Sequence, residues 1–139
     1  MQIDTSTDFG HRVSRRLVDE IVIWLTTTGS DGTPQPRPVW YLWDGETFLI
    51  YSMPDTHKIA HIRANPRVSL NFDSDGRGGD IAVFTGTASL EEGVNPAEHS
   101  PDYIHKYHSD IRGIDMTVES FSRDYNVAIR VTPDRLRGE

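Results

Sequence analysis

The stretch from Tyr51 to Lys58 brings hydroxyl, imidazole and ammonium groups close together along the chain. A predicted strand ends at Ser52, and Asp55 or Thr56 can cap the helix that follows. The first backbone N–H groups of a helix have no partner within it, and the helix dipole favours negative charge there. Lys58 adds a full charge beside them. The stretch therefore predicts an anion site that suits a phosphate group. A capped helix with solvated basic residues is an alternative interpretation of the same residues.

The charge of the chain restricts its partners. The formal net charge is -7, from 14 basic and 21 acidic side chains. Such a surface opposes nucleic-acid binding, which depends on many contacts from Lys and Arg to phosphates. A small anion in a local basic pocket remains compatible with it, because several basic residues fall within about thirty positions of one another. These are Arg37, His57, Lys58, His61, Arg63 and Arg67.

Three absences narrow the class of protein that we expect. The chain has no cysteine, which excludes disulfides, thiolate metal ligands and a cysteine nucleophile. No apolar run approaches the roughly 18 residues that a membrane helix needs. The first ten residues are polar and lack the basic start and apolar middle of a signal peptide. We therefore expect a cytoplasmic protein that binds neither membranes nor nucleic acid.

Two histidine pairs have spacings that occur in metal sites. His57 and His61 lie four residues apart, and His105 and His108 lie three apart, so each pair can share one helix face. Lys58 stands where a metalloprotease helix has its glutamate, and a cation there disfavours a dication. We therefore interpret these residues as surface histidines and expect no metal.

An acidic, glycine-rich segment resembles a calcium loop only in composition. Asp73, Asp75 and Asp80 surround several glycines. Arg77 takes the place of an oxygen ligand, and Phe84 stands where the bidentate glutamate of such a loop belongs. A loop between two strands is the better interpretation. No nucleophile elbow or phosphate-binding P-loop is present either.

The hydrophobic pattern predicts one domain, residues 1–139, of mainly β class with flanking helices. Six antiparallel strands joined by tight turns favour a barrel over a doubly wound sheet. The predicted strands cover residues 21–28, 35–43, 47–52, 66–73, 81–90 and 125–132. Helices are expected at residues 10–20, 57–64 and 115–123, and after Ser100-Pro101, with a polar tail over residues 133–139.

Three prolines alternate through the second predicted strand, at positions 34, 36 and 38. Proline removes a ladder donor, so the run predicts an edge strand with an unpaired stretch of backbone beside which a flat ligand can lie. Trp40, Tyr41 and Trp43 follow it. Their rings either stack on an aromatic ligand or belong to the core.

Three stretches together carry a family resemblance. The first is LTTTGSDGTPQPRPVWYLWDG at residues 25–45. The second combines residues 49–54 with residues 58–68, and the third covers residues 127–138. From about Leu17 to Gly138 the chain resembles the split β-barrel proteins related to pyridoxamine 5'-phosphate oxidase. Within them it is most similar to the actinobacterial branch that uses the deazaflavin coenzyme F420.

The resemblance implies a six-stranded split barrel and a homodimer with two cofactor sites at the interface. It also implies an enzyme that transfers a hydride from reduced F420 to an electron-poor small molecule such as a quinone, enone, tetrapyrrole or xenobiotic. The matching cofactor-binding positions are Arg37, Pro38 and Val39 beside the ring, Ile50, Tyr51, Ser52 and Met53 along the cofactor, and Thr56, His57, Lys58 and Ile59 around its phosphate. The resemblance assigns no proton donor, and a tyrosine or a water can serve.

Two other functions remain open at this point. One is an FMN-dependent oxidase or reductase on the same barrel. The other is a non-catalytic carrier or sensor of a flavin-like or haem-like ligand. F420 carries a phosphodiester and a polyglutamate tail, so an acidic protein that binds it must gather local positive charge. Arg37, Lys58, Arg63 and Arg67 are the candidates.

Overall fold

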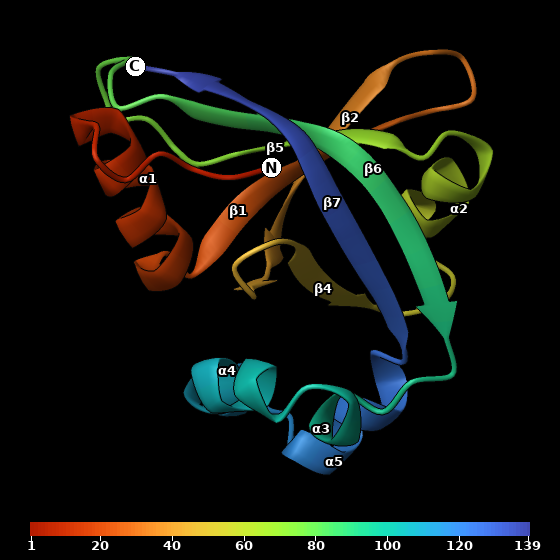
Figure 1. The fold of residues 1–139 in the computed structure, drawn as a ribbon. Helices are drawn as coiled ribbons and strands as arrows, with labels where there is room; N and C mark the ends of the chain where they lie inside the picture. The colour runs from red at the N-terminus through yellow and green to blue at the C-terminus, as the bar shows by residue number, and fades with distance from the viewer.

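The computed structural model describes residues 1–139 as seven strands and five helices (Figure 1). The strands are β1 Val22–Thr28, β2 Pro34–Trp40, β3 Leu42–Trp43, β4 Phe48–Ser52, β5 Arg67–Asn71, β6 Ala82–Glu92 and β7 Val127–Gly138. The helices are α1 Asp8–Asp19, α2 His57–Ala64, α3 Pro96–His99, α4 Pro101–Gly113 and α5 Val118–Asp124. No helix is long and apolar enough to cross a membrane.

The strands form one antiparallel sheet in the order β2-β1-β5-β6-β7-β4-β3. The sheet curls so far that β2, at one edge, comes into contact with β4, next to the other edge. β6 and β7 are the longest strands and cross the whole molecule side by side (Figure 1). This confirms the mainly β class and the split barrel.

The strand count differs from the expected six because the second predicted strand divides at Tyr41. The Tyr41 N–H donates to the Tyr107 hydroxyl of α4 over 2.8 Å, instead of to a neighbouring strand. The same hydroxyl lies 2.7 Å from the carbonyl oxygen of Ile21 and 2.9 Å from that of Tyr41. A side chain far along the chain therefore ends β2 and starts β3.

The last strand is longer than predicted, and the expected polar tail is part of it. β7 continues from Thr132 to Gly138, and its residues Arg135 to Gly138 pair with the first residues of β6. Most side chains of this end are exposed. Its polar composition reflects that exposure, while the backbone still completes a ladder of the sheet.

The proline run lies on an edge strand, as predicted. β2 pairs only with β1, and Pro34, Pro36 and Pro38 stand opposite Thr28, Thr26 and Trp24. Alternate residues of a strand direct their backbone groups to the same side, so all three missing N–H groups fall on one side of β2. The run therefore leaves the β1 ladder intact and removes donors from the free edge.

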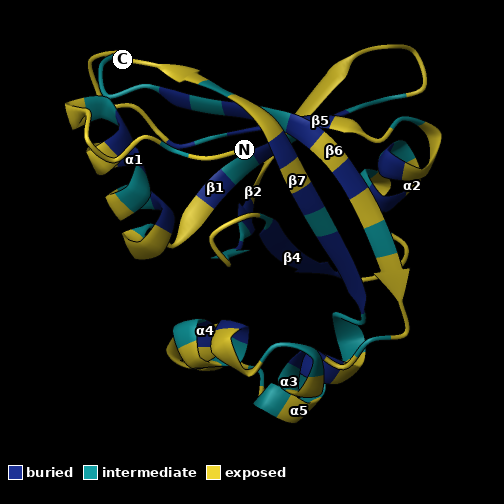
Figure 2. Cartoon of the chain, in the orientation of Figure 1, coloured by how far each residue is buried: buried dark blue, intermediate teal, exposed yellow.

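β4 is buried at every position (Figure 2). Hydrophobic clusters pack on both of its faces. Phe48 and Ile50 point into the main core of the barrel. Leu49 and Tyr51 point the other way, into a second cluster with Tyr103 and other residues of α4 and α5. Because side chains alternate along a strand, one short element joins the two clusters.

The second cluster is covered by α3, α4 and α5, which all belong to the connection from β6 to β7 (Figure 1). The backbone N–H of Val94 donates to the carbonyl of Asn126 over 3.0 Å, which ties the two ends of this helical connection together. Ser100 caps α4 by accepting from the Tyr103 N–H, and Thr117 and Ser120 form a capping box on α5. α3 was not predicted.

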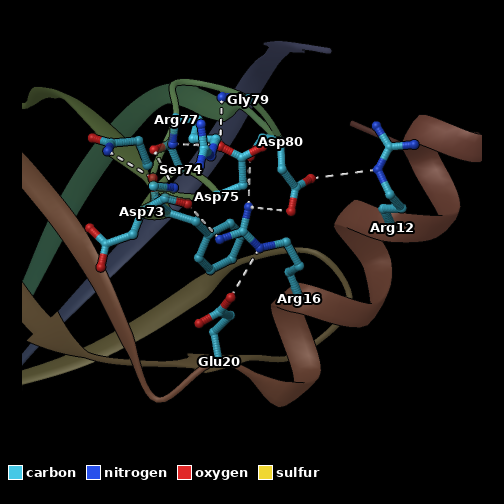
Figure 3. Close-up of polar contacts among 12 residues, drawn as sticks. Arg12, Arg16, Glu20, Asp73, Ser74, Asp75, Arg77, Gly79 and Asp80 are labelled. Carbon is cyan, nitrogen blue, oxygen red and sulfur yellow. Dashed lines mark hydrogen bonds and ion pairs between the residues drawn. The ribbon is translucent and has the colours of Figure 1, made fainter.

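α1 is held against the loop between β5 and β6 by Arg16 (Figure 3). Its guanidinium donates to the carbonyl oxygens of Asp80 and Asp73 over 2.8 and 2.7 Å, and to the Glu20 carboxylate over 3.0 Å. Asp75 accepts from backbone N–H groups of its own loop, including that of Gly79. The acidic segment is a loop between two strands, as predicted, and its carboxylates stabilise the loop and bind α1.

We expect Tyr107→Phe to destabilise the protein by about 1–3 kcal/mol, because it leaves the buried Tyr41 N–H without an acceptor. Urea unfolding followed by circular dichroism measures the change. Tyr125→Phe is the matched control, since the Tyr125 hydroxyl makes no hydrogen bond within the chain. An equal loss of stability in both variants would show that the Tyr107 hydroxyl does not hold the break between β2 and β3.

Candidate functional site

The turn between β4 and α2 leaves the start of α2 without a side-chain cap. The hydroxyl of Ser52 donates to the carbonyl of Met53 over 2.7 Å and lies 2.9 Å from the hydroxyl of Thr56. Thr56 occupies the N-cap position, but its hydroxyl is engaged with Ser52 and makes no cap bond to α2. Backbone donors at the start of the helix therefore remain available to an anion.

Two cations meet beside this uncapped helix start. Burial lowers the pKa of Lys58, and the nearby positive charge of Arg37 lowers it further. Neither residue forms an ion pair with a carboxylate. Two like charges held together without a counter-ion favour an anionic ligand between them.

The other two basic candidates do not reach this place. Arg63 pairs with Glu92 of β6, and Arg67 pairs with Asp134 of β7. Their charges are balanced locally, so the expectation that they add to the site is wrong. The positive charge at the start of α2 comes from Arg37 and Lys58.

A cavity of about 380 Å³ lies beside the two cations, between β2, the end of β4 and the helical connection. Its walls are mostly apolar and rich in aromatic rings. The lining residues are Val22, Arg37, Pro38, Val39, Trp40, Tyr51, Met53, Thr56, Lys58, Tyr103, Ile114, Phe121 and Tyr125. Its volume and composition suit a flat organic ligand with one charged end. We call it the aromatic cavity.

A second hollow, of about 480 Å³, adjoins the aromatic cavity and is lined by no hydrophobic residue. It shares Arg37, Thr56 and Lys58 with the first. The remaining lining residues are Thr27, Gln35, Pro36, His57 and His61. We call it the polar hollow. The shared residues place the two cations at the junction of the apolar and the polar space.

The structure brings eight of the eleven predicted site residues to these two spaces. Arg37, Pro38, Val39, Tyr51, Met53, Thr56 and Lys58 line the aromatic cavity, and His57 lines the polar hollow. The side chains of Ile50 and Ile59 are buried in the main core and line neither space. Ser52 is fully buried and acts on the site only through its contact with Thr56.

Sequence reasoning missed the wall that the helical connection supplies. Tyr103, Phe121 and Tyr125 line the aromatic cavity, and none of them was among the predicted site residues. Of the three aromatic residues after the prolines, Trp40 lines the cavity and stacks on Tyr107 with ring centres 4.9 Å apart. Tyr41 is fully buried in the main core.

The hydroxyls of two cavity tyrosines, Tyr51 and Tyr103, keep their protons at neutral pH. Burial raises the pKa of Tyr51 to about 12. It also raises the pKa of Tyr103 well above the ordinary value, and nearby tyrosines add to this effect. Each phenol is therefore available as a hydrogen-bond or proton donor.

The His57 and His61 rings lie 6.3 Å apart at the polar hollow. The Nδ1 atom of His61 lies 2.9 Å from the Thr27 hydroxyl, so this ring is anchored to β1. No group of three or more histidine, aspartate or glutamate side chains gathers in a metal-binding arrangement. The pair faces the same space as the two cations.

Several solved structures have the same fold. An F420 reductase superposes with a TM-score of 0.72 at 21% identity, over 91% of this chain and 96% of that one. A putative pyridoxamine 5'-phosphate oxidase from Listeria innocua superposes with 0.67 at 25% identity, over 91% and 94%. A FAD-binding protein from Mesorhizobium loti superposes with 0.67 at 22% identity, over 91% and 90%. No curated protein matches the sequence.

The comparison with protein families covers almost the whole chain. The sequence model of the pyridoxamine 5'-phosphate oxidase family matches residues 11–138, which include every strand and every residue of the two spaces. The chain belongs to the pyridoxamine 5'-phosphate oxidase family.

Proposed function

We propose that the protein is an oxidoreductase that binds F420 and transfers a hydride from its reduced form to an electron-poor small molecule. One observation carries the proposal. Arg37 and Lys58 lie together without a carboxylate partner, at an uncapped helix start where an aromatic cavity meets a polar hollow. In F420, the flat ring matches the aromatic cavity, the internal phosphodiester matches the two cations, and the acidic tail matches the polar hollow.

The residues present fit each part of F420. The ring suits the aromatic cavity, where Val39 and Trp40 of β2 offer apolar surface. The phosphodiester suits the junction at Lys58, where charge-assisted hydrogen bonds can form. The polyglutamate tail suits the polar hollow, in which His57 and Gln35 can donate.

The chain itself would bind, orient and shield the reactants. The cofactor supplies the hydride. Arg37 and Lys58 hold its anionic part, and β2 fixes the plane of its ring. The aromatic residues of the helical connection exclude water and shape the space left for the acceptor. Tyr103 and Phe121 form the wall of this space, and its shape restricts which acceptors fit.

FMN is the alternative cofactor, in second place to F420. A solved structure of this fold is named as an F420 reductase, and another as a FAD-binding protein. FMN ends at its phosphate, so it would leave the polar hollow without a ligand. The size of that hollow, about 480 Å³, supports the cofactor with the longer anionic tail.

We also propose that a second copy of the chain completes the site. Met53 and Ile114 line the aromatic cavity but are 44% and 47% exposed, which leaves apolar surface at its rim. Val18 and Ile21 add further exposed apolar surface. A homodimer that covers these residues would exclude water from the cavity.

Titration of the purified protein with oxidised F420 and separately with FMN tests the cofactor. Trp40 lies in the cavity wall, so intrinsic fluorescence should change on binding. We expect saturable binding of F420 and much weaker binding of FMN. Tight binding of FMN alone would move the protein to the flavin branch, and binding of neither would remove the proposal.

Lys58→Ala should weaken F420 binding by about 1.5–3 kcal/mol, because a charge-assisted hydrogen bond to phosphate is lost. The same fluorescence titration measures it. Arg63→Ala is the matched control, since this neighbouring cation pairs with Glu92 instead.

Because burial lowers the pKa of Lys58, the affinity of the wild type for F420 should fall at alkaline pH as the ammonium deprotonates. Lys58→Arg should keep the affinity there. Unchanged affinity in Lys58→Ala would exclude Lys58 from the site.

The proposed homodimer predicts a sedimentation mass near twice 15.7 kDa at micromolar concentration. Ile114→Asp should shift the protein toward a monomer, because it places a charge on the apolar rim. Arg135→Asp, an exposed change at the far end of β7, is the control. A monomeric wild type would remove the proposed interface.

A further inference from the structure

A chain of three side chains leads from the aromatic cavity to the surface of the protein. The Tyr51 hydroxyl lies 2.6 Å from Nδ1 of His99, the last residue of α3. The other ring nitrogen of His99, Nε2, lies 3.1 Å from a carboxylate oxygen of Glu91 on β6. Both nitrogens of the imidazole are therefore engaged, one toward the cavity and one toward solvent.

Exposure rises steadily along this chain. Tyr51, which lines the cavity, is 4% exposed. The side chains of His99 and Glu91 are 21% and 66% exposed. A proton taken up at the surface thus has a continuous path to a group that faces the ligand space. The other cavity tyrosines, Tyr103 and Tyr125, have no hydrogen-bond partner within the chain that could resupply a proton.

Few charged side chains lie near the Tyr51 hydroxyl. Burial has the largest effect on the pKa of Tyr51 and raises it. Arg130 of β7 and a hydrogen bond with the Ser100 side chain lower this pKa, and Glu91 raises it. The Tyr103 ring packs edge-on against the Tyr51 ring at 4.7 Å, and the His99 ring does the same at 5.7 Å. No lysine or carboxylate other than Glu91 contributes. His99 is thus the one titratable group in direct hydrogen-bond contact with the phenol.

We propose that Tyr51 is the proton donor of the reduction and that His99 and Glu91 resupply its proton from solvent. This inference rests on the proposed function, because a hydride acceptor needs a proton to complete its reduction. Tyr51 is the catalytic residue of the three. His99 acts through Tyr51, and Glu91 holds the His99 ring in the orientation that faces the phenol.

The step balances for an enone and reduced F420. The hydride adds to the β-carbon, which leaves F420 oxidised and the enone as an enolate. The O–H bond of Tyr51 breaks, and its proton forms the new C–H bond at the α-carbon. The Tyr51 oxygen takes the Nδ1 proton of the His99 imidazolium, whose charge the Glu91 carboxylate stabilises. Solvent then returns one proton to the imidazole for the next cycle.

The first test needs no cofactor and asks whether the chain exists in solution. In protein labelled with ¹⁵N-histidine, Tyr51→Phe should shift the Nδ1 signal of His99, and Glu91→Gln should shift its Nε2 signal. The signals that disappear in His99→Gln are assigned to the His99 ring. Glu92→Gln is the matched control, because this adjacent carboxylate pairs with Arg63. Unshifted His99 signals in both variants would overturn the proposal.

The second test follows oxidation of reduced F420 by cyclohex-2-en-1-one. Tyr51→Phe should lower kcat by about 100-fold or more, as loss of a positioned proton donor does. His99→Gln should also lower kcat, because it removes the group that resupplies the Tyr51 proton. Its affinity for oxidised F420 should stay within about twofold, since His99 lines neither the aromatic cavity nor the polar hollow.

The outcomes separate the relay from the proposed function. If the wild type neither binds F420 in the fluorescence titration nor oxidises reduced F420 with the enone, the proposed reductase fails and the relay fails with it. If the wild type is active and Tyr51→Phe retains its kcat, the relay alone is overturned. If Tyr51→Phe loses activity but His99→Gln keeps the kcat of the wild type, Tyr51 is not resupplied through His99 and the proposal is likewise overturned.

Discussion

Burial of β4 on both faces is the constraint on which the rest of the molecule depends. A strand with polar residues on one face would close the barrel but leave no place for the helical connection to dock. Here Phe48 and Ile50 fill the barrel while Leu49 and Tyr51 bind α4 and α5 from outside. The end of β4 then leads directly into the turn and α2. The fold therefore brings barrel, helical wall and anion-binding turn together at one point.

The positive charge of the site is left unbalanced because no carboxylate pairs with its two cations. The chain has an excess of acidic residues, yet neither Arg37 nor Lys58 forms an ion pair with a carboxylate. Their proximity carries a cost in the free protein because like charges repel in partly buried surroundings. An anion relieves that repulsion on binding. The same arrangement gives a protein with net charge -7 a local site of positive charge, which the proposed cofactor requires.

The sequence predicts the local features of this site better than the features that depend on tertiary contacts. The strand end, the helix start at His57 and the edge position of the prolines were predictable, because caps, turns and missing donors act within a few residues. The break at Tyr41 was not predictable, since it depends on a hydroxyl sixty-six positions away. The same holds for the Tyr51–His99 contact, for which α3 had to be placed first.

The predicted cofactor residues divide along the same line. Arg37 and Lys58 line both spaces, as their positions in a strand and at a helix start led us to expect, and their contact with a cofactor stays a prediction. Arg63 and Arg67 were wrongly added because their partners, Glu92 and Asp134, come from distant strands. Ile50 lies in the correct strand but on its barrel face, where alternation turns it away from the cavity. Burial alone does not distinguish the two faces of a strand that is buried on both.

The helical connection has a consequence for how this fold can change. Its ends are joined by the bond from Val94 to Asn126, so the segment leaves and re-enters the sheet at one point. It supplies one whole wall of the aromatic cavity, yet no strand pairing passes through it. Sequence drift within this segment can therefore remodel that wall of the aromatic cavity while the cation pair and the barrel stay as they are. The shape of the cavity and the positive charge beside it are thus encoded in separate parts of the chain and can evolve independently.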